Sequence, residues 1–337
     1  MFMINKKDIT HSSNSPLYQQ VINKILSLIE GGSLRKNDKL PSVNDLYLKL
    51  GVSRVTVVNA YSHLKKAVLL KPGMARDFMW LRNVTCAHNV FFCFFDAMNS
   101  YKEVLYRSFV GTLGPGYNVD VYFHYYNLKQ FGRFVQNNLG DYSHYVVLPH
   151  FNEDVSKVLA PIPAGSLLLM DKDIPLLANV PAVFQHFKHD VFSCLSSGLY
   201  LLSKYKALHL IVDTGFQFIP QGILDGFTWF CKENGLEYSL KTDFSNKDIL
   251  KNHAYVAISD GSLISVIQQA KQKKWQLGRD IGLVSYDDTP LKSILEGGIT
   301  VITTDFMHMG QLAAKMIKER LRAKFENPAR LVVRNSL

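Results

Sequence analysis

Polar and charged side chains follow short apolar runs at several points in the last three quarters of the chain. Carboxylates accept paired hydrogen bonds from neighbouring hydroxyl groups, and aromatic faces cover the C–H side of a sugar ring. This mixture of side chains predicts a site for a polyhydroxylated small molecule. When each residue is considered alone, the alternative is a helix N-cap or a loop position, and we expect Asp305 to be an N-cap. The candidate site residues are Asp96, Tyr101, Lys102, His150, Asn152, His186, Ser259, Asp260, Asp287 and Thr304.

A second group of polar residues opens a predicted helix near the N-terminus. Ser53, Arg54 and Thr56 lie in its first turn, and Asn59 follows one turn later. An arginine can contact guanine O6 and N7 or a phosphate, and hydroxyl groups suit phosphate oxygens. The backbone N–H groups at a helix start also favour anions. These residues are candidates for contacts with double-stranded DNA, although an isolated Arg54 could equally be a solvated surface residue.

The elements around this helix predict a helix-turn-helix. Apolar residues recur with helical spacing over residues 18–29, which is typical of an amphipathic helix. Ser42 is a natural N-cap for a second, short helix that stops at Gly51. The third helix is expected over residues 54–66, and its first turn would enter the major groove.

The segment after the third helix predicts a wing. Residues 69–78 form two short strands around a Pro-Gly turn, in which Lys71 and Gly73 are further candidates for DNA contact. Residues 1–83 contain 13 Lys and Arg against 5 Asp and Glu, whereas residues 84–337 contain 25 against 23. A basic module joined to a nearly neutral one indicates that the first part binds a polyanion.

The rest of the chain alternates between short apolar runs and helical patterns, which predicts an α/β fold. Because there are too many strands for one small sheet, we expect two lobes with two parallel sheets covered on both faces. A ligand of such sheets lies beyond the carboxyl ends of the strands. Strands are expected at residues 90–95, 117–123, 145–148, 166–170, 182–184, 208–212, 255–258, 281–285 and 300–303, and helices at 103–113, 191–205, 222–234, 263–273 and 307–325.

Residues 15–78 resemble the winged helix-turn-helix of the GntR family of regulators. The matching pieces are Pro16-Leu17-Tyr18, Lys39-Leu40-Pro41-Ser42, Leu50-Gly51-Val52-Ser53-Arg54-x-Thr56-Val57 and Ala60-Tyr61-x-x-Leu64. The resemblance implies that Ser42 and position 44 also contact DNA. The family usually has an arginine where this chain has Asn44, and Gly-x-Gly in the wing where it has Gly73-Met74-Ala75.

Residues 88–335 resemble the sugar-responsive repressors of the lactose and ribose repressor superfamily, which are related to periplasmic binding proteins. The resemblance rests on residues 280–290, on residues 298–306, and on Pro220-Gln221-Gly222-Ile223-Leu224-Asp225-Gly226-Phe227. It implies that Asp287, the first aspartate of the Tyr-Asp-Asp stretch, binds the sugar. Where the superfamily often has a sugar-binding arginine, this chain has Ile223, so Gln221 is a further candidate for contact with the effector.

The sequence offers no motif for a cofactor or a metal. The four cysteines show no C-x-x-C spacing, neither dinucleotide nor P-loop glycine pattern occurs, and no lysine has the context of a pyridoxal-phosphate Schiff base. His186 and His189 form the tightest histidine pair, which we interpret as a surface coincidence. We expect no enzyme activity, and the alternative is a sugar-modifying enzyme that carries a DNA-binding domain.

These patterns predict a homodimeric transcriptional regulator whose affinity for a DNA operator depends on a small carbohydrate. We expect a DNA-binding domain at residues 1–78, a linker at 79–87, and a sensing and dimerisation domain at 88–337. Similarity to GntR-type domains fused to such sensors, as in arabinose repressors, favours a repressor and suggests a deoxyhexose effector such as L-fucose. The N-terminus lacks a secretory signal and the apolar runs are too short to span a bilayer, so we expect a cytoplasmic protein.

Overall fold

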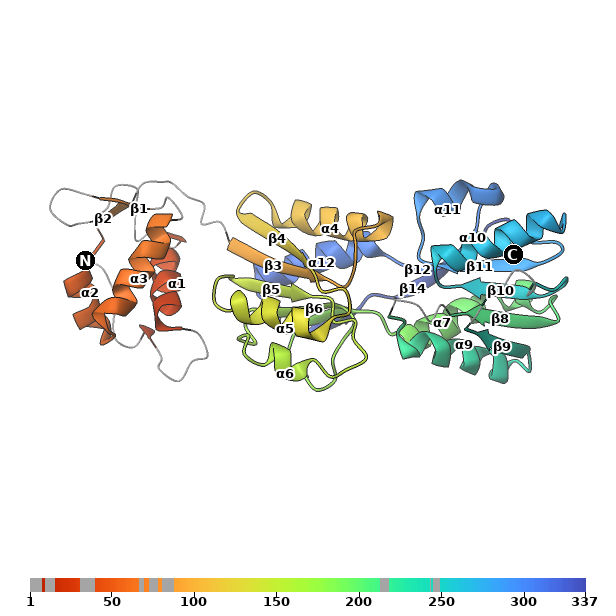
Figure 1. The fold of residues 1–337 in the computed structure, drawn as a ribbon, viewed down its shortest axis with the longest axis horizontal. Coiled ribbons are helices and arrows are strands. Elements are labelled where there is room, and N and C mark those ends of the chain that lie inside the picture. Colours follow the sequence, from red (N-terminus) through yellow and green to blue (C-terminus); the bar gives the residue numbers. More distant parts are fainter. Residues whose placement is uncertain are drawn as a thin grey trace.

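The computed structural model describes residues 8–9, 16–30, 40–66, 70–72, 78–80, 88–212, 218–242, 244 and 249–337. Figure 1 shows three parts in a row, which are a small helical head and two α/β lobes. Within these residues, no helix has the length and apolar character needed to cross a membrane.

The head contains the three predicted helices and a two-stranded wing. Strand β1 pairs with β2 in antiparallel fashion, and the tip of the wing lies outside the described residues. Strand β2 includes residues 79–80, which were expected to begin the linker. The elements are α1 (Leu17–Glu30), α2 (Val43–Leu50), α3 (Arg54–Lys66), β1 (Leu70–Pro72) and β2 (Phe78–Trp80).

A small apolar core holds the three helices of the head together. Ile25 of α1, Leu46 of α2 and Val57 of α3 are fully buried in it. The Tyr61 hydroxyl donates a hydrogen bond to the Pro41 carbonyl over 2.7 Å. This bond fixes the start of α2 against the middle of α3.

The first lobe is a six-stranded parallel sheet with strand order β13-β7-β6-β5-β3-β4. Helices cover both of its faces. The strands are β3 (His88–Phe94), β4 (Tyr117–Phe123), β5 (His144–Val147), β6 (Leu167–Asp171), β7 (Ala182–Phe184) and β13 (Lys324–Glu326). The helices are α4 (Ser100–Leu113), α5 (Leu128–Asn137), α6 (Ser156–Leu159) and α12 (Phe306–Glu319).

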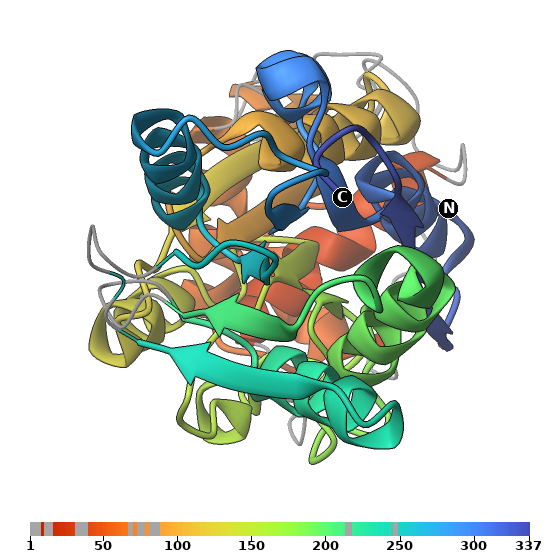
Figure 2. The same cartoon turned by 90° about the vertical axis from the view of Figure 1, so that its right-hand side faces the viewer.

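The second lobe has a six-stranded sheet with strand order β14-β12-β11-β10-β8-β9, in which only the edge strand β14 is antiparallel. Figures 1 and 2 show α10 on one side of this sheet and α7 and α9 on the other. The strands are β8 (Ala207–Ile211), β9 (Glu237–Lys241), β10 (Ala254–Ala257), β11 (Gly282–Tyr286), β12 (Thr300–Thr304) and β14 (Ala329–Val332). The helices are α7 (Phe187–Ser197), α8 (Leu199–Leu202), α9 (Gln221–Glu233), α10 (Asp260–Gln272), α11 (Pro290–Ile294) and η2 (Leu295–Gly297).

Successive residues of the inner strands face opposite sides of each sheet, and both sides are apolar. In β3, Val90, Phe92 and Phe94 pack with α4 and α12, whereas Phe91 and Cys93 pack with α5. This explains why the strands are continuous apolar runs rather than alternating ones. All nine predicted strands are present, and the prediction of two lobes with largely parallel sheets is confirmed.

The chain passes between the lobes three times within the described residues, after β7, β12 and β13. Asn327, which is fully buried, connects all three crossings. Its backbone N–H donates to Phe184 O over 2.7 Å, and its side-chain amide donates to the Thr304 hydroxyl over 2.6 Å and to Asp305 O over 3.1 Å. The crossings therefore form one hydrogen-bonded hinge.

Two helix predictions were wrong in their limits. The helix expected at 307–325 ends at Glu319, because Arg320 adopts a left-handed conformation with φ of 55°, and residues 324–326 form β13 instead. The helix expected at 191–205 is divided into α7 and α8 at Gly198. Asp305 caps α12 as expected, since its carboxylate accepts the His308 N–H over 2.9 Å.

Candidate functional site

A cavity of about 650 Å³ lies between the two lobes, beyond the carboxyl ends of β3, β4, β10 and β11. Six of the predicted effector residues line it, three from each lobe. They are Asp96, Tyr101 and Lys102 from the first lobe and Ser259, Asp260 and Asp287 from the second. The convergence of strand ends thus brings residues almost two hundred positions apart to one cavity.

Asp287 follows β11 in a left-handed conformation, with φ of 61°. Its backbone N–H donates to Ile302 O over 2.8 Å, which holds the turn against β12. Within the described chain, no group donates a hydrogen bond to its carboxylate. The pKa of Asp287 is raised to about 7, mainly by burial in the cavity; the Asp171 carboxylate contributes to the rise, while Lys292 and Lys102 oppose it. Asp287 is therefore a hydrogen-bond acceptor available to a ligand.

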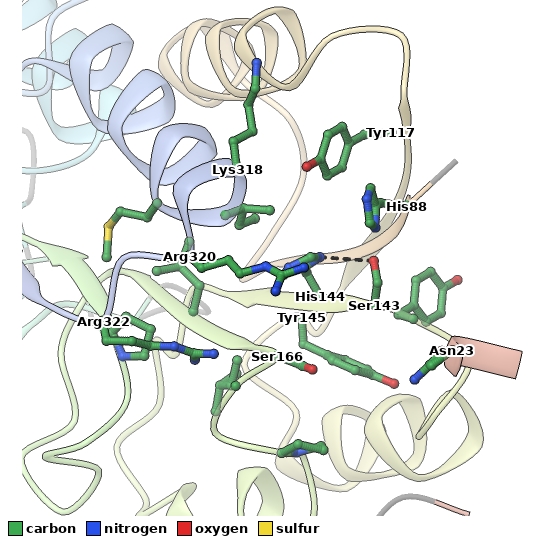
Figure 3. A pocket seen from close by; sticks show the side chains of 18 of the residues that line it. Asn23, His88, Tyr117, Ser143, His144, Tyr145, Ser166, Lys318, Arg320 and Arg322 are labelled. Atoms are coloured by element: carbon green, nitrogen blue, oxygen red, sulfur yellow. Dashed lines mark hydrogen bonds between the residues drawn. The ribbon is translucent and has the colours of Figure 1, made fainter. Parts of the chain in front are cut away.

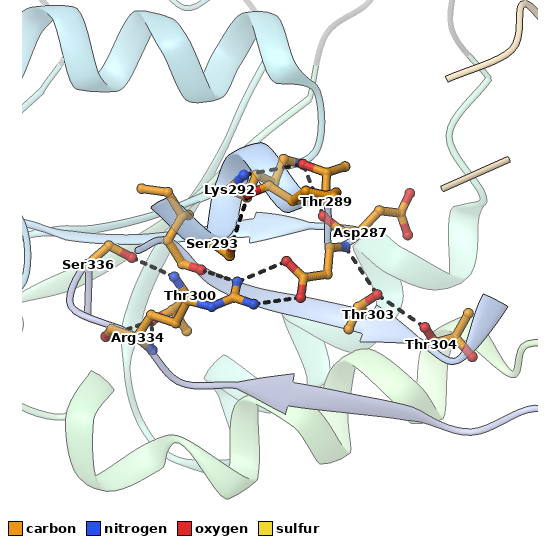
Figure 4. Close-up of polar contacts among 12 residues, drawn as sticks. Asp287, Thr289, Lys292, Ser293, Thr300, Thr303, Thr304, Arg334 and Ser336 are labelled. Atoms are coloured by element: carbon orange, nitrogen blue, oxygen red, sulfur yellow. Dashed lines mark hydrogen bonds and ion pairs between the residues drawn. The ribbon is translucent and has the colours of Figure 1, made fainter. Parts of the chain in front are cut away.

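The next residue, Asp288, has a structural role. The Arg334 guanidinium donates to both of its carboxylate oxygens, over 2.9 and 2.6 Å (Figure 4). The Asp288 N–H donates to the Thr303 hydroxyl over 3.1 Å. Figure 4 also shows the Asp287 side chain pointing away from this pair. Because the C-terminal segment holds Asp288 on one side, Asp287 is directed to the other.

Lys292 of α11 also lines the cavity, and the sequence analysis missed it. Only 4% of this residue is exposed. Its ammonium group donates to Tyr286 O over 2.8 Å and to Asp287 O over 3.0 Å, and it lies 3.0 Å from Asp260 Oδ1. Lys292 thus fixes the backbone of the Tyr286–Asp287 turn. The Thr289 hydroxyl caps α11 by accepting the Lys292 N–H. A threonine three residues before the lysine, followed by Pro290, is the sequence signal that places Lys292 in the first turn of this helix.

On the first-lobe side, Lys102 is almost completely buried and forms an ion pair with Asp96. Its ammonium group also donates to Ala97 O over 3.0 Å and lies 4.1 Å from the centre of the Phe95 ring. Burial lowers the pKa of Lys102 to about 8, although the Asp287 and Asp171 carboxylates oppose the shift. Both walls of the cavity therefore carry an acid and a buried amine.

Two aromatic residues extend the first-lobe wall. Tyr101 stacks on Phe306 of α12 with 4.6 Å between ring centres. Tyr126, which the sequence analysis missed, donates its hydroxyl hydrogen bond to Asp96 Oδ2 over 2.8 Å. Tyr126 and its neighbour Tyr125 follow β4 with positive φ angles. Both residues follow the carboxyl end of a predicted strand, where a ligand of such a sheet is expected, and this position is the sequence signal for them.

Ser259 lines the cavity but also acts as an N-cap, which was its alternative interpretation. Its hydroxyl accepts the Ser262 N–H over 3.0 Å at the start of α10. Asp260 is largely exposed and contacts Lys292. Of these two, Asp260 offers more acceptor capacity to a ligand.

Five predicted effector residues do not line this cavity. His150 is buried and its Nε2 lies 2.9 Å from Asp171 Oδ2. The Thr304 hydroxyl donates within the hinge to Asn327 O over 2.9 Å. The other three are exposed, Asn152 on a loop, His186 before α7 and Gln221 at the start of α9, where Gln221 donates to Asp225 over 3.0 Å. Their role in effector binding stays a prediction.

In the head, the predicted caps are present. The Ser42 hydroxyl accepts the Asp45 N–H over 3.2 Å and donates to the Asp45 carboxylate over 2.7 Å. Ser53 accepts the Thr56 N–H over 3.1 Å, and the two hydroxyl groups lie 2.8 Å apart. Ser53 and Thr56 thus stabilise the start of α3, and their hydroxyl groups retain hydrogen-bonding capacity for a partner such as a phosphate.

Three candidate DNA contacts, Asn44, Arg54 and Asn59, are exposed on α2 and α3. Val55, which the sequence analysis missed, is 66% exposed in the first turn of α3. An apolar side chain at this place suits the methyl group of thymine. The Lys71 side chain and Gly73 lie outside the described residues.

One group of side chains in the described residues has the spacing of metal ligands. His189, Asp190 and Glu326 bring their ligand atoms within 4.8 Å of one another beside the hinge. His189 and Glu326 are exposed, and Asp190 Oδ1 accepts the Ala329 N–H over 3.4 Å. His186 is not in this group, so the histidine pair of the sequence does not act as a unit there.

Two family models match parts of the chain. Residues 17–72 match the model of the bacterial regulatory proteins of the gntR family. Residues 207–337 match a periplasmic binding protein-like domain. A comparison with curated proteins finds no match to this sequence.

Solved structures share the fold of the two lobes at low sequence identity. A periplasmic binding protein/LacI transcriptional regulator from Alkaliphilus metalliredigens QYMF, complexed with D-xylulofuranose, has a TM-score of 0.61 and 11% identity, and the match covers 74% of this chain and 99% of that one. The trehalose repressor from Escherichia coli has a TM-score of 0.61 and 13% identity over 73% and 99% of the two chains. A dimeric Lac repressor has a TM-score of 0.63 and 16% identity over 74% and 98%.

The helix-turn-helix, the two lobes and these matches agree with the resemblances drawn from the sequence. The chain therefore joins a head that matches the gntR family of bacterial regulatory proteins over residues 17–72 to a two-lobed fold that matches a periplasmic binding protein-like domain over residues 207–337.

Proposed function

We propose that this protein is a transcriptional regulator whose affinity for a DNA operator is controlled by a small carbohydrate bound between the lobes. The observation that carries the proposal is the Asp287 carboxylate, which faces the interlobe cavity without a hydrogen-bond donor from the described chain. A carboxylate in such a position binds two adjacent hydroxyl groups of a sugar.

The composition of the cavity supports a neutral, polyhydroxylated ligand. Asp287 and Asp260 provide acceptors, and Tyr101 and Tyr126 provide aromatic surface for the C–H face of a sugar ring. The volume of about 650 Å³ accommodates a monosaccharide. Two structural relatives are a sugar-complexed regulator and a trehalose repressor, which agrees with this class of ligand.

We assign DNA binding to the head. We also propose that the protein acts in the cytoplasm, where its operator would lie. We propose phosphate and base contacts from the first turn of α3 and from the start of α2, with the wing on the backbone. The proposed contacts are Ser42, Asn44, Ser53, Arg54, Thr56, Asn59, Lys71 and Gly73. A Lac repressor of the same fold has been solved as a dimer bound to operator. A homodimer of this chain would read half-sites about 34–36 Å apart.

The proposed mechanism couples the two sites through the hinge at Asn327. We assign residues 1–78 to DNA binding, 79–87 to the linker and 88–337 to sensing and dimerisation. A sugar that contacts Asp96 and Asp287 together binds the closed arrangement of the lobes better than the open one. Only such a difference in affinity shifts the equilibrium. Closure then changes the spacing of two heads in a dimer and weakens operator binding.

The effector is identified by thermal unfolding in the presence of single sugars. L-fucose is the first candidate, and pentoses, other hexoses and their phosphates are tested beside it. The bound sugar raises the melting temperature by mass action. A gel-shift assay then tests whether the same sugar changes operator affinity. A protein that binds operator DNA but responds to no sugar would contradict the proposal.

The cavity also permits a second candidate function, a sugar-modifying enzyme. Asp287, with a pKa of about 7, and Lys102, with a pKa of about 8, have values suited to general acid–base catalysis. Incubation with the bound sugar followed by mass spectrometry separates the two functions. A sensor returns its ligand unchanged, whereas an enzyme produces a new mass.

A further inference from the structure

A second pocket, of about 460 Å³, lies at the end of the first lobe that faces the head. It is bounded by the amino ends of β3, β4, β5 and β6 and by the end of α12, and α1 of the head closes one side. We call it the basal pocket. The residues used below are Asn23 of α1 and His88, Ser143, His144, Ser166, Lys318, Arg320 and Arg322 of the first lobe (Figure 3).

The basal pocket carries positive charge without acidic partners. Its described lining includes Lys318, Arg320 and Arg322 but no Asp or Glu. Lys318 donates to Thr112 O over 3.0 Å, and Arg322 donates to Ala164 O over 2.8 Å. Within the described chain none of these three side chains forms an ion pair. Figure 3 shows Arg320 extending toward His144 and Arg322 toward Ser166, whereas Lys318 points toward α4.

His144 reports the same excess of positive charge. Its Nδ1 lies 3.0 Å from the Ser143 hydroxyl. The pKa of His144 is lowered to about 4, mainly by burial and in part by the nearby His88, Arg320 and Arg322. An anion bound in the basal pocket would offset the electrostatic repulsion among these positive charges.

We propose that the basal pocket binds a phosphorylated small molecule, which contacts the head and the first lobe together. Two guanidinium groups offer the paired donors that match phosphate oxygens, and Ser166 and Asn23 add uncharged polar groups. The volume falls in the usual range for small-molecule sites. The ligand would be a second input, separate from the sugar in the cleft.

The test uses the full-length protein and calorimetric titration with pyrophosphate and inorganic phosphate at constant ionic strength. The Arg320→Gln/Arg322→Gln double variant removes both guanidinium groups. Arg133→Gln is the matched control, since Arg133 is exposed on α5 of the same lobe and does not line the pocket. We expect the wild type and the control to bind equally, and the double variant to bind about tenfold more weakly or worse.

Two results would overturn the proposal. One is an absence of heat beyond a chloride control in the wild type, or equal affinities in wild type and double variant. The other is a wild type that binds no phosphate while the double variant has a lower affinity for duplex DNA and a weaker salt dependence, since the arginines would then contact the DNA backbone. The sugar response of the double variant is measured in parallel, and it should remain because Asp287 is unchanged.

Discussion

Arg334 and Asp288 form a two-pronged ion pair, with donor–acceptor distances of 2.9 and 2.6 Å, that ties the C-terminal segment to the turn after β11. The pair assigns different roles to two adjacent aspartates. Asp288 is held by Arg334 and lies outside the cavity lining, whereas the Asp287 carboxylate faces the cavity. Each aspartate can therefore be tested by a separate substitution with a different readout.

Asp287→Asn should weaken the sugar response and leave operator binding in the absence of sugar unchanged. The substitution removes the charge but keeps the shape, so charge-assisted hydrogen bonds to sugar hydroxyls are lost at about 1.5–3 kcal/mol. Sugar affinity measured by calorimetry should fall about tenfold to a hundredfold. Gel-shift assays without sugar provide the control. A variant that still responds normally would show that the sugar does not bind at Asp287.

Asp288→Asn should instead reduce stability and preserve the sugar response. The substitution breaks the bidentate pair with Arg334. Because the side chains of Asp288 and Arg334 are both partly exposed, we expect the unfolding free energy to fall by about 1–2 kcal/mol. Thermal or urea unfolding measures this loss. Arg334→Gln should give a similar value, and the double substitution should cost less than the sum of the two single ones, because the residues share one interaction. Additive effects would mean that the pair contributes no coupling energy.

The apolar patterns of the sequence predicted the inner strands because those strands are buried on both faces. Three of the four edge strands, β9, β13 and β14, escaped prediction, whereas the edge strand β4 was predicted. Strand β9 is partly exposed and begins with Glu237 and ends with Lys241, so it has no continuous apolar run. Strand β13 lies in a stretch where Leu321 and Phe325 continue the helical spacing of α12. Only the left-handed Arg320 ends that helix, and the pairing of β13 with β7 comes from a segment 140 residues earlier.

The site was predictable where a residue directly follows a strand, as Asp96 and Asp287 do. It was not predictable where tertiary contacts decide the role. Lys292 lies inside a short helix, and nothing in its local sequence shows that its ammonium group reaches the Asp287 carbonyl. His150 also follows a strand, yet its side chain is buried and pairs with Asp171 instead of lining the cavity.

Arg54→Ala should weaken operator binding by about 1–3 kcal/mol without lowering stability, because Arg54 is exposed at the start of α3. Ser53→Ala should behave differently. Its hydroxyl caps α3 through the Thr56 N–H, so its loss should lower the unfolding free energy of the head by about 1 kcal/mol. Gel shifts and thermal unfolding of both variants separate the two effects, with Arg133→Ala in the first lobe as control. Equal DNA affinity of Arg54→Ala and wild type would exclude a base contact by Arg54.

The raised pKa of Asp287 predicts a specific dependence of stability on pH. An unfolded aspartate ionises near pH 3.9, about its ordinary value, whereas burial raises the pKa of Asp287 to about 7 in the folded protein. Between these values the folded state holds a proton that the unfolded state has released. Stability from this group is therefore full below about pH 4, declines as the pH rises, and changes no further above about pH 7. Asp287→Asn should remove this decline, so unfolding curves of the two proteins should converge in acid and diverge toward neutral pH, with the variant more stable.

Sugar hydroxyl groups favour the ionised carboxylate, so sugar binding near pH 6 should release a proton in the wild type and none in the variant. Calorimetry in two buffers of different ionisation enthalpy measures that proton, and equal heats in both buffers would show that Asp287 keeps its protonation state when the sugar binds.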